Sequence, residues 1–221
     1  KAGDFVKARA LYAPTRIYWE RIETVAESFG DLDPSMDARE ADLEPGQKWT
    51  GWHKIEKDLW PPKTGYTALT AAERNSVADQ LLKDTRTLHS RTRTQTYTVD
   101  GMGNGSKGLL DEVATGKVTG EEETWSHTDL WDFQGNVDGA RIAWENLRPL
   151  LKKKDASLDS SIATKFAALQ KLLDKHKVSG SGDDVVFKTY DKLSDAEVKE
   201  LSNAVNALSE PLSKLTAAVT L

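Results

Sequence analysis

Three helix-start signals, each ahead of a long amphipathic segment, constrain the fold of this chain more than any other feature. Each places a Ser or Thr three residues before an acidic residue, which is the capping-box pattern. They are Thr70-Ala71-Ala72-Glu73, Ser126-His127-Thr128-Asp129 and Ser194-Asp195-Ala196-Glu197. The signals predict helices over about residues 70–96, 127–153 and 194–219. Apolar residues at three- and four-residue steps predict further helices over residues 4–29 and 156–176.

Breaker residues separate these segments. Gly30, Pro45-Gly46 and Pro61-Pro62 end helices, and the last pair closes a short helix over about residues 51–60. The glycine-rich stretch 101–108 is expected to be a loop or a loosened helix start. Residues 97–99 and 185–187 are too short to build a sheet. We therefore predict an all-α protein that forms a single domain over residues 1–221. Within this domain we expect two consecutive four-helix-type bundles as the alternative to one, with a break near residues 97–125.

The absence of cysteine narrows the chemistry that the chain can support. Disulfides and thiolate metal sites are excluded, so any metal must be held by His, Asp, Glu or water. No apolar run approaches the length that crosses a bilayer, and no membrane-spanning segment is expected.

Negative charge is concentrated in two blocks of a chain whose net charge is −5. Residues 20–44 carry nine acidic residues against two arginines, and residues 111–138 carry eight against one lysine. Two acidic blocks in a chain whose other residues are mildly basic favour a cation site over a nucleic-acid-binding surface. Two solvated surface faces are the alternative reading of the same pattern.

One motif places an imidazole and a carboxylate together. In Gly51-Trp52-His53-Lys54-Ile55-Glu56, the side chains of His53 and Glu56 are three residues apart on the predicted helix. Their Cβ atoms would then lie about 5–6 Å apart on one face. Helical bundles use this spacing in iron sites. Alone the motif is weak, because a surface histidine with an ion-pairing glutamate has the same spacing.

Several motifs in order resemble the imelysin-like family, specifically its EfeO branch of iron-uptake proteins. In the first half they are Glu20-Arg21-Ile22-Glu23, Ser28-Phe29-Gly30-Asp31-Leu32-Asp33, Asp37-Ala38-Arg39-Glu40 and the Gly-x-His-x-x-Glu motif at Gly51–Glu56. In the second half they are Gly120-Glu121-Glu122-Glu123, Ser126-His127-Thr128-Asp129-Leu130-Trp131-Asp132-Phe133-Gln134, Asn136-Val137-Asp138-Gly139 and Leu147-Arg148-Pro149-Leu150. The resemblance covers nearly the whole chain.

The resemblance implies two helical bundles in a periplasmic or cell-surface lipoprotein that takes part in iron uptake. The family motif assigns metal binding to His53 and Glu56, and position suggests Asp79 and Glu122 or Glu123 as further ligands. The expected cargo is iron, with zinc or copper as alternatives. An iron permease and a haem peroxidase are the partners that the resemblance implies. The cupredoxin-like domain that often precedes the helical one is missing, so the chain is expected to be a domain of a longer protein or a short form.

Two other functions remain open beside metal capture. The tryptophans could line a groove for an acidic polysaccharide, with metal as a bridge. A zinc metallopeptidase is the weaker alternative, because the sequence has no His-Glu-x-x-His helix and only His53 offers a convincing imidazole. His89 and His176 have basic neighbours and are interpreted as structural. We expect no enzymatic activity.

Overall fold

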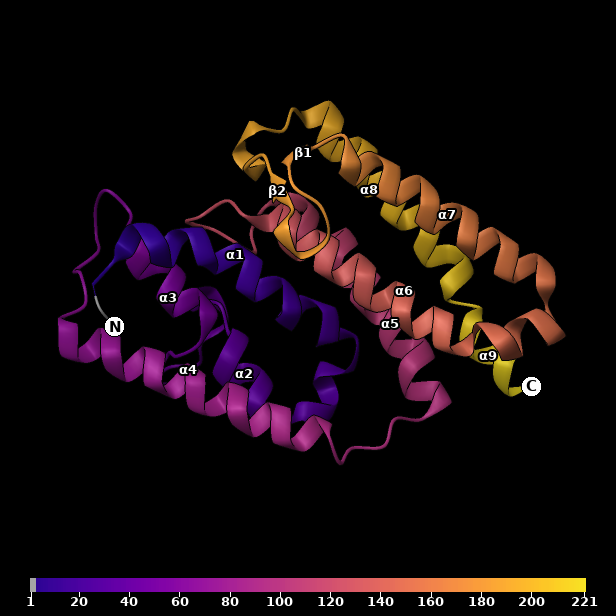
Figure 1. The fold of residues 1–221 in the computed structure, drawn as a ribbon, viewed down its shortest axis with the longest axis horizontal. Helices are drawn as coiled ribbons and strands as arrows, with labels where there is room; N and C mark the ends of the chain where they lie inside the picture. The colour runs from indigo at the N-terminus through magenta and orange to yellow at the C-terminus, as the bar shows by residue number, and fades with distance from the viewer. Residues whose placement is uncertain (1–2) are drawn as a thin grey trace. The chain divides into compact units, whose positions relative to one another are not determined.

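The computed structural model describes residues 3–221, with Glu27 described by its backbone alone, and helices account for most of this part of the chain. The helices are α1 (Phe5–Ile22), α2 (Leu32–Asp37), α3 (Trp52–Leu59), α4 (Ala71–Thr92), α5 (Val99–Thr115), α6 (Asp129–Lys154), α7 (Ala156–Asp174), α8 (Asp195–Leu212) and α9 (Leu215–Thr220) (Figure 1). Strands β1 (Lys177–Ser179) and β2 (Val186–Phe187) form a small antiparallel hairpin. The prediction of an all-α protein is confirmed.

The chain divides into two units, and each unit is assembled from segments that are not contiguous in sequence. The first unit comprises residues up to Ala13 together with Ala26–Thr96 and Glu123–Ser126. The second unit comprises Pro14–Val25, Tyr97–Glu122 and His127–Leu221. Helix α1 contributes residues to both units, and Pro14, which lacks an N–H donor, lies within it where the assignment changes.

Four long helices form the second unit. Helix α5 packs against α6 and α8, and α7 packs against the same two helices, so the four close into a bundle; α7 and α8 run side by side in Figure 1. Helix α9 covers α5 and α6. Fully buried apolar side chains fill the interior, among them Leu110, Leu130, Leu151, Leu169 and Leu201. Their burial is the main force that holds the bundle together.

The first unit combines the long helix α4 with the short helices α2 and α3, and the three pack on one another. Helix α4 begins at a capping box, where the Thr70 hydroxyl accepts the Glu73 N–H and the Glu73 carboxylate accepts the Thr70 N–H. The same reciprocal pair at Ser194 and Glu197 opens α8 in the second unit. Two of the three predicted capping boxes are therefore present.

The third predicted capping box is wrong. Helix α6 follows Thr128, whose side chain makes no capping hydrogen bond, and His127 before it has a positive φ of 56°. The Ser126 hydroxyl donates instead to the Glu123 carboxylate. The Ser126 hydroxyl, which the pattern predicted as the helix cap, is therefore bound to Glu123.

The glycine-rich stretch was also predicted wrongly, since residues 101–108 lie inside α5 rather than in a loop. Close packing explains glycine there: a Cβ at Gly105 would lie 1.9 Å from the Thr24 carbonyl oxygen. At the C-terminal end, the single predicted helix is two helices, α8 and α9, with a turn at Ser213 and Lys214. The periodicity of apolar residues predicts where helices lie. The packing of neighbouring segments determines whether a glycine-rich stretch stays helical and where a helix is interrupted.

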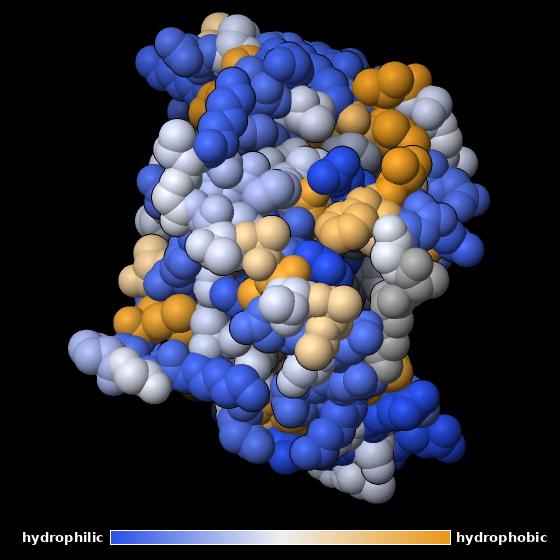
Figure 2. Space-filling view, turned by 90° about the vertical axis from the view of Figure 1, so that its left-hand side faces the viewer, coloured by the Kyte–Doolittle hydropathy of each residue, from blue (hydrophilic) through white to orange (hydrophobic). Residues whose placement is uncertain are grey.

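The surface is mainly polar on the face that Figure 2 shows, where hydrophobic residues form small groups among hydrophilic ones. Within residues 3–221, no helix is both long and apolar enough to cross a membrane.

Gly51 should be the glycine of the first unit least able to accept a side chain. It begins α3 with φ 88° and ψ −162°, and a Cβ there would lie 2.1 Å from the Met36 carbonyl oxygen. Gly46 has a similar φ of 85° but open space around its Cβ position. Gly46→Ala should cost about 1–2 kcal/mol of unfolding free energy, and Gly51→Ala about 1–3 kcal/mol more. Urea denaturation measures both, and equal midpoints would contradict the expectation.

Candidate metal centre

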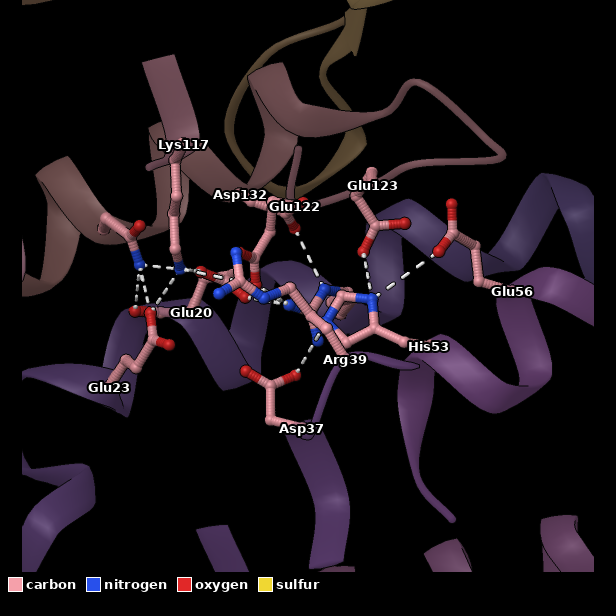
Figure 3. Close-up of polar contacts among 12 residues, drawn as sticks. Glu20, Glu23, Asp37, Arg39, His53, Glu56, Lys117, Glu122, Glu123 and Asp132 are labelled. Atoms are coloured by element: carbon pink, nitrogen blue, oxygen red, sulfur yellow. Dashed lines mark hydrogen bonds and ion pairs between the residues drawn. The ribbon is translucent and has the colours of Figure 1, made fainter. Parts of the chain in front are cut away.

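A buried imidazole surrounded by carboxylates lies in the first unit. His53 has no exposed surface. Its Nδ1 atom lies 3.5 Å from Glu56 Oε2 and 3.7 Å from Glu123 Oε1, and its Nε2 atom lies 3.5 Å from Asp37 Oδ1. The three carboxylates point toward the ring in Figure 3. Each of the two imidazole nitrogens therefore faces at least one carboxylate.

Helix α3 provides two members of the cluster. Because His53 and Glu56 are three residues apart on this helix, both side chains emerge on its buried face. Gly51 precedes the helix with a positive φ, and its Cα lies close to the backbone of Met36. The helix ends before Pro61. The short helix therefore presents the pair in a fixed register, as the motif predicted.

The two oxygen atoms of the Glu56 carboxylate have different surroundings. Its Oε1 atom accepts hydrogen bonds from the backbone N–H groups of Trp125, at 2.8 Å, and Ser126, at 2.7 Å. Its Oε2 atom is buried and accepts no hydrogen bond within the described part of the chain. One oxygen thus fixes the orientation of the carboxylate, and the other is directed at His53.

Glu123 reaches the cluster from the short segment Glu123–Ser126, which joins the first unit although its flanking residues belong to the second. The Tyr12 hydroxyl donates to Glu123 Oε1 at 3.2 Å, and the Ser126 hydroxyl donates to Oε2 at 2.8 Å. Glu123 is fully buried. Two neutral donors therefore hold this carboxylate in place.

Asp37, at the end of α2, was not predicted as a site residue. Its side chain is 10% exposed and faces the imidazole nitrogen opposite to the one that faces the two glutamates. A carboxylate behind a metal-binding histidine commonly fixes the ring orientation and tautomer. The acidic block at residues 20–44 and the motif Asp37-Ala38-Arg39-Glu40 of the family resemblance were the sequence signals near it. Tyr12 and Ser126 were missed because nothing in their local sequence links them to Glu123.

The spacing of the donor atoms fits one transition-metal ion. One donor atom each from His53, Glu56 and Glu123 lies within 4.8 Å of the others. Bonds of about 2.1 Å in a tetrahedral site place ligand atoms roughly 3.4 Å apart, close to the separations of 3.5 and 3.7 Å from His53 Nδ1. One nitrogen and several carboxylate oxygens suit iron, zinc or manganese.

Asp79, predicted as a ligand, is exposed on α4 and does not belong to the cluster. The buried residues of that helix are Leu81, Asp84 and Leu88. At about 100° per residue, Asp79 lies on the opposite side of α4 from this buried face. The geometry therefore does not support Asp79 as a ligand, because matching by position could not determine which face of α4 would be buried.

Glu122 belongs to the second unit, where it joins a buried network of charges. The guanidinium of the fully buried Arg16 lies 2.7 Å from Glu20, 2.9 Å from Glu122 and 3.4 Å from Asp132. The ammonium of Lys117 lies 2.7 Å from Glu20. Burial alone would raise the pKa of the Glu20 carboxyl, but the charges of Lys117 and Arg16 lower it further than burial raises it.

Two of the other three histidines, His89 and His176, lie apart from this chemistry. His89 is exposed on α4, among basic residues. His176 is buried, with Nδ1 3.7 Å from Glu197. Burial, and after it the charge of Lys188, lower the pKa of His176 and so favour the neutral ring. Neither histidine belongs to the groups of potential metal ligands found among the described residues.

Residues 1–215 match the sequence model of the peptidase M75 family, described as imelysin. An "Efem/EfeO family lipoprotein" of Staphylococcus aureus (strain NCTC 8325 / PS 47) is 46% identical over 216 residues, which cover 96% of this chain and 73% of the relative. A protein with the same description from strain MSSA476 is 45% identical with the same coverage.

The lowered pKa of Glu20 predicts how stability depends on pH. Because the folded state binds this proton less readily than the unfolded state, the stabilisation is present above the unfolded pKa of 4.5 and is lost as the pH falls below it. Glu20→Gln should therefore show a shallower loss of unfolding free energy from about pH 5 to pH 3.5 than the parent. Urea denaturation across this range tests the slope, and equal slopes would refute the assignment.

Proposed function

The chain belongs to the imelysin family, and on this basis we propose that it captures a transition-metal ion, with iron as cargo, outside the cytoplasm in a bacterial uptake system. The observation that carries the proposal is the buried His53 with three carboxylates around it. The description of the relatives as lipoproteins supports an extracytoplasmic place, at the cell surface or in the periplasm. Delivery of the ion to an iron permease, with a haem peroxidase as a further component, is part of the same proposal.

Three side chains would bind the ion directly in this proposal. His53 Nδ1, Glu56 Oε2 and Glu123 Oε1 face one another, and each carboxylate is fixed by hydrogen bonds through the rest of its group. Asp37 would orient the ring from the opposite nitrogen. A cation also removes the repulsion between the carboxylates, so binding is strongest for ions of high charge. The donor set contains no soft sulfur ligand, which favours iron, zinc and manganese over copper(I).

Polysaccharide binding is the weaker proposal, because the tryptophans near the motif are engaged in packing. Trp49 is buried and lies 5.9 Å from the half-buried Trp125, centroid to centroid. Lys57 lies over both rings and pairs with Glu40. A cation held over aromatic faces in this way stabilises the local structure. The arrangement leaves little open aromatic surface for a sugar ring at this point.

His53→Ala should weaken binding of Fe²⁺ and Zn²⁺ at least tenfold, or about 1.4 kcal/mol. Glu56→Gln should behave alike, since the amide can still accept the two backbone hydrogen bonds but offers a poorer ligand. The double variant should lose less than the sum, because both residues act on one ion. Affinity should fall as the pH falls, since protons compete for the ligands.

Isothermal titration calorimetry measures these affinities, with His89→Ala as the matched surface control. The control should bind as the parent does. Parental affinity in His53→Ala would place the metal site elsewhere in the chain.

Peptidase activity should be absent. Zinc hydrolases usually fix the metal with two or three imidazoles and keep an open position for water, whereas this cluster has one imidazole and several carboxylates. Carboxylate ligands also reduce the Lewis acidity that activates water. A quenched fluorescent peptide library with added Zn²⁺ checks this expectation. Metal-dependent cleavage that disappears in Glu56→Gln would overturn it.

A further inference from the structure

Lys57, in the last turn of α3, lies among three aromatic rings of the first unit. Its ammonium lies 5.1 Å from the ring centroid of Trp125 and 5.6 Å from the centroids of Trp49 and Tyr66. Cation–π attraction acts over distances up to about 6 Å. Glu40 pairs with the same ammonium, and the Lys57 side chain is only 13% exposed. The positive charge is therefore largely removed from water and held over the rings.

Helix α3 contacts the segment Glu123–Ser126 through two successive residues. The Glu56 carboxylate accepts hydrogen bonds from the backbone N–H groups of Trp125 and of the residue after it. Lys57, the next residue of the helix, lies over the ring of Trp125. The backbone and the side chain of one tryptophan are thus bound by neighbouring residues of α3.

The position of this segment determines whether the candidate metal centre is complete. Residues 122–126 form turns, so the regular hydrogen bonds of a helix do not fix their backbone. Glu123 nevertheless provides one donor atom of the cluster and is fully buried. Because Glu123 and Trp125 are two residues apart, a contact that fixes the tryptophan ring also restricts where the Glu123 carboxylate can lie. The same contact keeps the backbone N–H groups beside Glu56.

We propose that Lys57 is a positioning residue of the metal centre, whose ammonium holds the ring of Trp125 and so keeps the segment Glu123–Ser126 against α3. Its effect on metal affinity rests on the proposed function, whereas its effect on the segment does not. Charge alone predicts the opposite effect on affinity, because a positive charge next to Glu56 repels a metal ion. Loss of the Lys57 charge should therefore weaken metal binding if position dominates and strengthen it if repulsion dominates.

Lys57→Gln removes the charge and keeps a polar side chain at this position. We expect it to weaken Zn²⁺ binding about three- to tenfold in isothermal titration calorimetry. Transfer of Zn²⁺ to a chromogenic chelator should be faster by a similar factor, since the segment leaves α3 more often. Lys57→Arg should bind as the parent does, because a guanidinium is also attracted to aromatic faces.

Trp125→Leu removes the other half of the contact and keeps the backbone N–H group that Glu56 accepts. It should weaken Zn²⁺ binding as Lys57→Gln does. In the Trp125→Leu background, Lys57→Gln should cause little further loss, because both changes remove the same contact. Losses that add fully would show that Lys57 acts without Trp125 and would overturn the inference.

Lys54→Ala is the matched control for charge. Lys54 is on the same helix and lies over the ring of Trp49, 4.7 Å from its centroid, rather than over Trp125. Its loss should leave Zn²⁺ affinity unchanged or raise it. Equal weakening in Lys54→Ala and Lys57→Gln would contradict the inference, and so would unchanged or tighter binding in Lys57→Gln.

Amide hydrogen exchange in the metal-free protein separates this inference from the proposed function. In Lys57→Gln the amides of Trp125 and Ser126 should exchange at least about threefold faster than in the parent, because the segment opens more readily. Lys57→Arg and Lys54→Ala should retain the parental rates. If the parent binds no Zn²⁺, the proposed function fails, and the exchange rates then decide the role of Lys57. Parental exchange rates in Lys57→Gln would overturn the inference.

Discussion

Buried carboxylates are the constraint on which both units of this protein depend. An ionised carboxylate that leaves water without compensation costs several kcal/mol even after relaxation. Glu20, Glu56 and Glu123 are all fully buried. Hydrophobic packing alone cannot retain such groups, so the surrounding helices must supply charge or hydrogen-bond donors at defined positions. Much of the local geometry, including the segment before α6, follows from that demand.

The two units meet this demand in different ways. In the second unit, the compensating charges belong to Arg16 and Lys117 and cannot leave the protein. In the first unit, neutral donors and one imidazole surround Glu56 and Glu123, and part of each carboxylate is directed toward His53. A fixed cation gives stability that is always present. A site that an exchangeable cation would complete would gain stability only when the cation is bound, as the proposed function requires.

The sequence predicts the helices well because caps and periodicity act locally, as at Thr70 and Ser194. The pairing of His53 with Glu56 was equally predictable, since one helical turn determines it. Asp37 was not predicted, because its place beside the imidazole depends on how α2 and α3 pack. Asp79 lies outside the cluster for a related reason: spacing along α4 does not determine which face of the helix is buried. Tertiary packing, rather than local propensity, selects the remaining members of the site.

The assignment of Glu123–Ser126 to the first unit has a consequence during translation. Position 123 follows position 53 by 70 residues, and at about 5–20 residues per second the ribosome needs roughly 4–14 s to synthesise that stretch. Throughout this interval the nascent chain contains His53 and Glu56 but lacks Glu123 and the two backbone amides that hold Glu56. Helix α3 therefore cannot bury its glutamate in the native arrangement when it is made. The first half of the protein must wait for a four-residue segment from the second half before its interior can close.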